Sequence, residues 1–276
     1  MTRIAAAALL AAAIPLLSIA QPHVGQPGKD VMWVPTPEAV VERMLKMTRV
    51  APTDFVVDLG SGDGRIVIAA AKAFGAQASG IEFNPELVAL AKLNARAAGV
   101  EHKVRFVQGD LFKLDWSAAT VVTMYLLPEL NMRLRPRLLE MKPGTRLASH
   151  QFGMNDWEPD ERVELDGRVA YAWVVPARVA GQWSLSYSVG PATTTHALAL
   201  RQAYQKISGT VSQGGYTATL EDARLRGTEI VLAFVDRTGV KRRLVGRVGE
   251  SQMEGRLDSD RAIEVRWIAS RAKNPR

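Results

Sequence analysis

The sequence predicts an α/β fold, a doubly wound, Rossmann-like sheet of seven strands, followed by a small all-β domain. Residues 55–59 form an apolar run that ends in a glycine-rich turn and continues into helix-forming residues at 65–72. Apolar runs then alternate with helical segments as far as residue 149, as they do where helices connect parallel strands. From residue 179 onward the runs are short, alternate between apolar and polar side chains and are interrupted by glycine, which is typical of antiparallel strands.

The composition is that of a folded protein. The chain has 276 residues, of which 47% are hydrophobic and 23% charged, so a wholly disordered chain is excluded. It contains no cysteine, which excludes a disulfide scaffold, a thiolate zinc site and a cysteine nucleophile. The four histidines are scattered without the spacing of a metal site, so we expect no bound metal.

The charge is distributed unevenly along the chain. The net charge is +7, and residues 179–276 contain fifteen basic and nine acidic residues, whereas residues 21–178 contain nineteen of each. Such a difference suggests two modules. We therefore expect a first domain at residues 30–178 and an all-β domain at residues 179–276.

The first twenty residues have the layout of a secretory signal peptide. One arginine precedes a run of alanine, leucine and isoleucine, and a small-x-small cleavage site follows at Ser18-Ile19-Ala20. We expect residues 1–20 to direct export to the periplasm or the medium. Alternatively, an uncleaved segment would anchor the protein in the inner membrane, and this is the one case in which we expect membrane contact. In a third alternative the true start is Met32, and the protein then lacks residues 1–31.

The glycine-rich turn directly follows the first strand. Its sequence is Gly60-Ser61-Gly62-Asp63-Gly64, and the strand before it contains Asp58. Glycines adopt positive φ angles and let a ligand approach the backbone closely. The N-terminal amides of the next helix point into the same space. The turn therefore predicts a nucleotide-like ligand at the carboxyl end of the first strand.

The other elements of the first domain follow in order. Asn84 and Pro85 are typical of a helix N-terminus, Lys142-Pro143-Gly144 ends another helix, and Asp166-Gly167 predicts a hairpin turn. We expect strands at residues 78–81, 104–107, 120–126 and 145–149, helices at residues 85–98 and 129–141, and a terminal hairpin at residues 163–171.

The second domain is expected to be an antiparallel meander. Residues 182–189 alternate cleanly between apolar and polar side chains, and residues 217–220 and 264–268 do so in part. Glycine recurs in similar contexts at intervals of roughly ten to twenty residues, which suits a small sandwich or barrel. The basic run Lys241-Arg242-Arg243, with Arg247 and Arg256, either forms a basic surface for an acidic partner, RNA or anionic lipid, or is a solvated strand face, which is the interpretation preferred here. Because no aromatic motif of the RNA-binding type accompanies it, nucleic acid is not expected as a partner.

The glycine-rich turn differs from the dinucleotide fingerprint, because its third glycine comes one position early. The pattern Asp58-Leu59-Gly60-Ser61-Gly62-Asp63-Gly64 resembles instead the motif of class I S-adenosylmethionine (SAM) methyltransferases. By this resemblance Glu82 would hold both ribose hydroxyls, Asp110 would lie beside the adenine amine, and the terminal hairpin would match the family's antiparallel sixth and seventh strands. The resemblance implies these cofactor-binding residues: Asp58, Gly60, Ser61, Gly62, Glu82, Asp110, Leu111 and Thr36.

Residues 31–155 are similar, more closely, to the FAM173-type protein-lysine methyltransferases, which are related to the Dot1-like enzymes. The most specific part of the match is Asp-Leu-Gly-Ser-Gly-Asp-Gly-Arg-Ile at residues 58–66. The resemblance implies that the methyl acceptor is a lysine side chain of a protein. The signal-like N-terminus and the C-terminal domain depart from the eukaryotic members, so the identity of their substrates does not transfer.

Methyl transfer to an amine requires positioning and a deprotonated nucleophile, and it requires no metal or covalent intermediate. The acceptor should bind after the fourth strand, at residues 125–131, which lack the proline-rich box of DNA adenine methyltransferases. We expect Tyr125 to line the acceptor channel and Glu129 to orient or deprotonate the amine. Alternatively, Tyr125 is a core residue and Glu129 favours a helix N-terminus. Three further residues either wall the acceptor site or serve in packing: Trp33, His150 and Trp157.

Three functions remain open from the sequence. The first is SAM-dependent methyl transfer to an amine, with a protein lysine as the expected acceptor. The second is methylation of a small molecule at the same cofactor site. The third is a non-catalytic, exported protein of the same fold that binds a ligand or partner, since SAM is made in the cytosol and an exported enzyme would need a supply of it.

Overall fold

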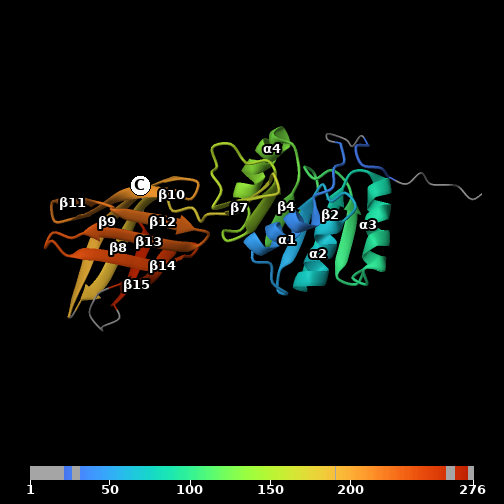
Figure 1. The fold of residues 1–276 in the computed structure, drawn as a ribbon. Coiled ribbons are helices and arrows are strands. Elements are labelled where there is room, and N and C mark those ends of the chain that lie inside the picture. The colour runs from blue at the N-terminus through green and yellow to red at the C-terminus, as the bar shows by residue number, and fades with distance from the viewer. Residues whose placement is uncertain (1–21, 27–31, 190, 259–264, 273–276) are drawn as a thin grey trace, which may run out of the picture.

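The structure is a computed structural model of the 276-residue chain, and it describes residues 22–26, 32–189, 191–258 and 265–272. The predicted signal segment at residues 1–20 lies outside this range. Two sheets form two separate bodies, an α/β body and an all-β body (Figure 1). Within the described ranges, no helix combines the length and the apolar character that a membrane span requires.

The first sheet has seven strands in the order β3-β2-β1-β4-β5-β7-β6. Strands β1 to β5 run parallel. The order reverses between β1 and β4, which makes the carboxyl ends of these two strands the expected ligand position. The strands are β1 (Phe55–Leu59), β2 (Gln77–Glu82), β3 (Val104–Gln108), β4 (Val121–Met124), β5 (Arg146–His150), β6 (Glu161–Leu165) and β7 (Arg168–Val174).

The terminal hairpin on the Asp166-Gly167 turn is confirmed. Asp166 and Gly167 have φ angles of 49° and 72°, as a tight two-residue hairpin turn requires. Strand β7 is antiparallel to both β5 and β6. Strand β6 therefore runs in the same direction as β1 to β5. Of the two hairpin strands, only β7 is therefore antiparallel to the parallel strands, because it is inserted between β5 and β6.

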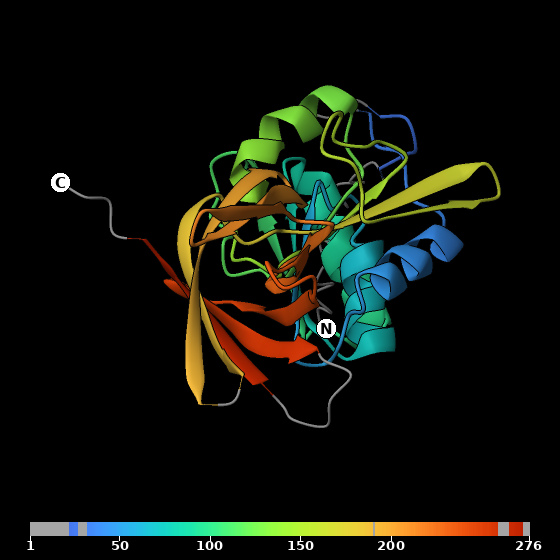
Figure 2. The same ribbon diagram turned by 90° about the vertical axis from the view of Figure 1, so that its left-hand side faces the viewer.

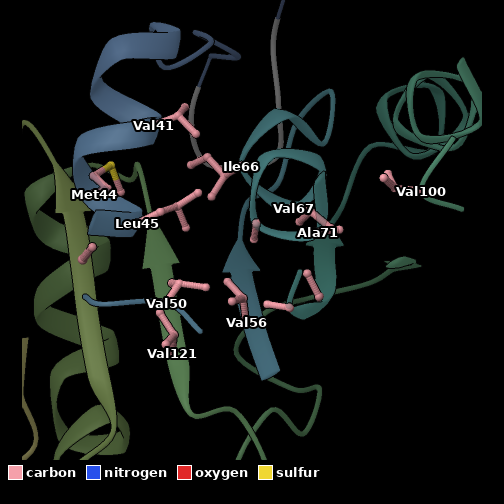
Figure 3. Packing of buried hydrophobic residues seen from close by; sticks show 14 of the residues in the cluster. Val41, Met44, Leu45, Val50, Val56, Ile66, Val67, Ala71, Val100 and Val121 are labelled. Carbon is pink, nitrogen blue, oxygen red and sulfur yellow. The ribbon is translucent and has the colours of Figure 1, made fainter. Parts of the chain in front are cut away.

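Helices cover both faces of this sheet. Helices α1 (Glu38–Met47), α2 (Arg65–Phe74) and α3 (Pro85–Ala97) pack on one face, where Figure 3 shows residues of α1 and α2 against β1 and β4. Helix α4 (Pro128–Leu139) packs on the other. Neighbouring strand residues point to opposite faces of the sheet. Val56 therefore packs in the hydrophobic core under α1, α2 and α3, and Val57 packs in the core under α4. Strands buried on both faces explain the near-continuous apolar runs.

The helix boundaries follow from local chemistry. The side chain of Asn84 accepts a hydrogen bond from the Glu86 N–H (2.8 Å), and Pro85 occupies the first position of α3. Gly75 and Gly99, with φ angles of 74° and 71°, follow the ends of α2 and α3. Because α2 and α3 directly follow β1 and β2 in the chain, their N-termini lie near the carboxyl ends of these strands.

The second sheet closes on itself and forms a barrel. Its nine strands have the order β11-β10-β12-β13-β14-β15-β16-β8-β9, and β9 also pairs with β10, so eight strands form a ring to which β11 adds as a hairpin. Figure 2 views the molecule from this side, with the strands coloured yellow to red. The strands are β8 (Gly181–Val189), β9 (Ala192–Ala203), β10 (Lys206–Gln213), β11 (Tyr216–Thr219), β12 (Asp222–Arg226), β13 (Glu229–Val235), β14 (Lys241–Val248), β15 (Gln252–Asp258) and β16 (Val265–Arg271).

The barrel has a core of its own. Trp183, Phe234 and Trp267 are almost fully buried in it. Of the two predicted all-β architectures, the barrel is therefore the one observed. The first sheet ends at Val174 and the barrel begins at Gly181, so the predicted division after residue 178 falls in the connecting segment.

Candidate active site

A cavity of about 460 Å³ opens at the carboxyl ends of β1, β2 and β4. Its position is the point at which the strand order of the sheet reverses, and its size is typical of a site for a small ligand. Its walls come from the glycine-rich turn, the ends of these strands, and residues 32–36, which precede α1. We call residues 33–36 the strap.

The glycine-rich turn has a backbone that glycine alone adopts easily. Gly60, Gly62 and Gly64 have φ angles of 78°, 51° and 80°. The N–H groups of Gly60 and Ser61 donate to the carbonyl of Ile81 (2.9 and 3.0 Å), which fixes the turn over β2. A Cβ on Gly62 would lie 2.6 Å from Nε1 of Trp33. Both the conformation and the space at Gly62 therefore require glycine.

Glu82 lies at the end of β2 with its carboxylate oriented by the backbone. The N–H of Gly62 donates to Oε2 and the N–H of Asn84 donates to Oε1, both at 2.9 Å. An ionised carboxylate has about four acceptor positions. Two remain for a ligand in the cavity that Glu82 lines, which is what a pair of ribose hydroxyls requires.

Asp58 is a buried carboxyl group in the cavity wall. It is 2% exposed, and its Oδ1 accepts a hydrogen bond from the hydroxyl of Thr123 (2.7 Å). Burial, with smaller effects of the negative charges of Glu82 and Asp63, raises the pKa of Asp58 to about 7, against the lowering effect of the Thr123 hydrogen bond. A cationic ligand group at this position would stabilise the ionised form of the side chain.

The strap is fastened to both sides of the cavity. The guanidinium of Arg65 donates to the carbonyl of Thr36 (2.9 Å) and pairs with Asp63 (2.7 Å). The hydroxyl of Thr36 shares a hydrogen bond of 3.1 Å with Nδ1 of His150, at the end of β5. With Trp33 against Gly62, the strap forms one wall of the cavity.

The end of the cavity beyond β4 is apolar and aromatic. Tyr125 and Phe152 line it, with their ring centroids 6.3 Å apart, together with Leu127 and Leu130. The ring of His150 lies behind Tyr125 at 4.0 Å and is fully buried. Burial, with a smaller effect of the Arg168 charge, lowers the pKa of His150 to about 4, so the imidazole is neutral at physiological pH.

The structure brings most of the predicted site residues together. All eight predicted cofactor residues and Tyr125 line the one cavity. Glu129 does not line it, because this side chain is exposed in the first turn of α4. The role of each residue stays a prediction that the experiments below test.

The three residues with two interpretations have different positions. Trp33 lines the cavity, and His150 supports it from behind. Trp157 does not line it, since it is fully buried between Trp173 and Tyr204. The packing interpretation is therefore the one observed for Trp157.

Two residues that line the cavity, Phe152 and Arg65, and one that packs behind it, Gly80, were not expected from the sequence. Phe152 lies just after β5, as Tyr125 lies just after β4, and this position at the carboxyl end of a strand could have identified it. Arg65 follows the glycine motif directly. Gly80 lies inside β2, where a Cβ would be 2.4 Å from the hydroxyl of Ser61, and a glycine inside a strand is itself a signal of close packing.

Comparisons with known proteins agree with this geometry. The family model of the ANTKMT methyltransferase domain matches residues 58–161. A protein-lysine N-methyltransferase of Saccharolobus islandicus is 47% identical over 138 residues, which are 49% of this chain and 86% of that protein. The adenine nucleotide translocase lysine N-methyltransferase of Mus musculus is 38% identical over 131 residues, which are 47% of this chain and 57% of that protein.

A solved structure is similar over about the same proportion of the chain. It is described as an RNA methyltransferase of Salinibacter ruber in complex with S-adenosyl-L-homocysteine. The two chains are 54% identical, with a TM-score of 0.52, and the match covers 53% of this chain and 96% of that one. Each of these comparisons thus leaves about half of the present chain without a counterpart.

Proposed function

Because this chain belongs to the class I SAM-dependent methyltransferases, in the family with the ANTKMT-type domain, we propose that its methyl acceptor is the side-chain amine of a protein lysine. The observation that carries the proposal is the apolar end of the cavity beyond β4, formed by Tyr125, Phe152, Leu127 and Leu130. The relatives that are named as lysine methyltransferases support the same acceptor.

SAM is the cofactor of this family, and the residues of the cavity fit it. Gly62 has no side chain, so the backbone of the glycine-rich turn packs directly against Trp33, where a Cβ would lie 2.6 Å from Nε1. Glu82 has acceptor positions to spare for ribose hydroxyls, and Asp58 offers a buried carboxyl to a cationic group. When bound, SAM supplies a methyl group on a sulfonium, which is a strong electrophile.

The apolar end of the cavity would prepare the amine. A lysine amine is protonated in water, and its lone pair becomes available when the proton leaves. Burial against Tyr125 and Phe152 disfavours the ammonium form and lowers its pKa, so the amine loses its proton more readily there. The neutral His150 behind Tyr125 adds no positive charge that would repel the ammonium as it enters.

Glu129 is the proposed acceptor of this proton. Its carboxylate is exposed at the start of α4, close in sequence to Leu127 and Leu130 of the cavity wall. From there it would pass the proton to solvent. In the transfer the C–N bond would form as the C–S bond breaks, and the positive charge of the sulfonium would pass to the methylated nitrogen. The proton that the ammonium loses beforehand would leave for solvent and carry the charge of that ammonium with it.

The experiment uses the purified chain, radiolabelled SAM and a cell extract of the same organism, with Glu82→Ala as a control for the cofactor site. Label that is protease-sensitive and yields methyl-lysine on hydrolysis would support the proposal. Label in the small-molecule fraction or in RNA would overturn the lysine assignment in favour of those acceptors, and RNA is included because of the description of the Salinibacter protein. Binding of SAM without transfer to any fraction would favour the non-catalytic alternative.

Export is a separate proposal, which rests on the signal-like sequence of residues 1–20. Its test is cell fractionation with N-terminal sequencing of the protein. A protein in the periplasm that begins at Gln21 would support it, whereas a cytosolic protein that retains Met1 would contradict it. A membrane-bound protein that retains residues 1–20 would identify the segment as an anchor.

A further inference from the structure

The loop between β5 and β6, residues 151–160, begins with a strained turn at the cavity. Gln151 has a φ angle of 67°, and the N–H of Phe152 donates to the carbonyl of His150 (2.8 Å). A three-residue turn of this hand is rare, and strained backbone of this kind persists where surrounding contacts enforce it. The turn directs Phe152 into the cavity wall beside Tyr125.

Some of the contacts that hold this turn and loop come from the first domain. The carbonyl of Phe152 accepts hydrogen bonds from the hydroxyl of Ser149 (2.7 Å) and the side-chain amide of Asn131 (3.1 Å). Further along, Arg135 of α4 donates to the carbonyl of Met154 (3.2 Å) and pairs with Asp156. These contacts attach the start of the loop to β5 and α4.

Further contacts with the loop come from the barrel, at the turn between β9 and β10. The hydroxyl of Tyr204 donates to Asp156 (2.8 Å), and Nε1 of Trp157 donates to Oε1 of Gln205 (3.1 Å). The side-chain amide of Gln205 donates in turn to the carbonyl of Glu158 (2.7 Å). Two residues of the barrel thus contact three consecutive residues of the loop.

An aromatic stack adds to these hydrogen bonds. The rings of Trp157 and Tyr204 are nearly parallel, 15° apart, with centroids at 5.9 Å, and Trp157 is fully buried. The ring of Trp173 also contacts Trp157, with centroids at 6.1 Å. Without Tyr204, one side of Trp157 would lose its cover, and an exposed indole in a short loop would shift. Phe152 lies five residues away on the same loop.

The comparisons indicate that the barrel, and with it the contacts of Tyr204 and Gln205 with the loop, is an addition to the methyltransferase fold. The matched half of this chain accounts for 96% of the Salinibacter chain, which leaves no room there for a second domain of the size of the barrel. That chain is described in complex with S-adenosyl-L-homocysteine, so ligand binding in a domain of this fold does not depend on a barrel there. A barrel that contacts the β5–β6 loop can instead act on the acceptor side of the site.

We propose that the β9–β10 turn of the barrel is a positioning element for the acceptor, and that Tyr204 and Gln205 hold the β5–β6 loop so that Phe152 stays packed beside Tyr125. The inference rests on the proposed function, since it takes the apolar end of the cavity as the acceptor site. The cofactor end is held separately, because Ile81 fixes the glycine-rich turn and the turn orients Glu82.

The experiment compares Tyr204→Ala with a matched control, Tyr216→Ala, which removes a tyrosine that is 41% exposed at the start of β11 in the same barrel. The dissociation constant of SAM should stay within about twofold in both variants. In Tyr204→Ala, kcat/KM for the methylated protein should fall roughly tenfold or more, as displaced acceptor-binding groups cause. Tyr204→Phe, which keeps the ring on Trp157, should recover most of this loss, and Tyr216→Ala should lose nothing.

Hydrogen exchange of residues 151–158, measured by mass spectrometry, gives a readout that needs no acceptor. Faster exchange in Tyr204→Ala than in Tyr216→Ala would support the inference even if the wild type methylated no protein, an outcome that would overturn the proposed function alone. Equal exchange in the two variants would overturn the inference, as would equal losses of SAM binding and transfer in Tyr204→Ala. Gln205→Ala, which removes hydrogen bonds and leaves the stack, serves if Tyr204→Ala fails to fold.

Discussion

Replacement of Asp58 by asparagine tests whether the buried carboxyl near the end of β1 lowers the free energy of unfolding when it ionises. The side chain is 2% exposed, and burial, with smaller effects of the Glu82 and Asp63 charges, raises its pKa from 3.8 to about 7. Asparagine has nearly the same shape, and its oxygen can still accept the hydrogen bond from Thr123. The substitution therefore removes the titration of the group and changes little else.

The sign of the effect follows from proton binding. Between pH 3.8 and about 7, the folded protein keeps a proton on Asp58 that the unfolded chain has lost, so the unfolding free energy falls as the pH rises. One pH unit corresponds to about 1.4 kcal/mol, and the whole shift to about 4 kcal/mol. Relative to the wild type, Asp58→Asn should gain about 3 kcal/mol between about pH 5 and pH 8 and little more above that range.

Denaturant titrations followed by hydrogen exchange measure this gain, because the exchange of β1 and β4 reports on the first domain separately from the barrel. Glu129→Gln, which removes an exposed carboxylate, is the control and should show no such gain. Unfolding free energies of Asp58→Asn and the wild type that run parallel over this pH range would refute the reasoning. Calorimetry should also show that the wild type binds SAM more tightly as the pH rises through 7, whereas the variant binds weakly at every pH.

Three further substitutions test other parts of the molecule. Gly62→Ala should lose about 1–2 kcal/mol of stability because alanine tolerates the positive φ poorly. It should also bind SAM more weakly, because Trp33 must move to make room for the Cβ. The control Gly99→Ala has a similar φ but no neighbouring atom within 4 Å, so calorimetry should find its SAM affinity unchanged. Glu129→Gln should leave SAM binding intact and lower kcat/KM roughly 100-fold if the carboxylate takes the proton of the amine, and an unchanged pH–rate profile would contradict that role. Leu134→Ala, at a fully buried position of α4, should cost about 2–5 kcal/mol in denaturant unfolding, and a loss below about 1 kcal/mol would contradict its place in the core.

The parts of the fold that could be predicted are those with a local signal. The glycine-rich turn, the capping residue Asn84 and the turn at Asp166-Gly167 each depend on side chains close together in sequence, and each is observed where it was expected. The direction of β6 could not be predicted in this way, since it depends on which strand lies between β5 and β6. That choice is made by packing in the whole sheet.

The candidate site shows the same division. Asp58, Glu82 and Asp110 follow from a motif and from strand ends, which place them at one edge of the sheet. The contacts of Arg65 with Thr36 and of Tyr204 with Asp156 join residues 29 and 48 positions apart, and nothing in the local sequence indicates them. The sequence therefore identified the residues at the glycine-rich end of the cavity and only part of those at its apolar end.

The hydrogen bond between Thr36 and His150 spans 114 positions of the chain, which sets an order on biosynthesis. The ribosome delivers Thr36 early, but the strap has no anchor on β5 until His150 has been made and β5 has joined β4. A nascent chain that ends before this point exposes an open glycine-rich turn with an unfinished wall. Because this wall is completed last, cofactor binding is expected to stabilise the finished first domain more than any shorter nascent chain.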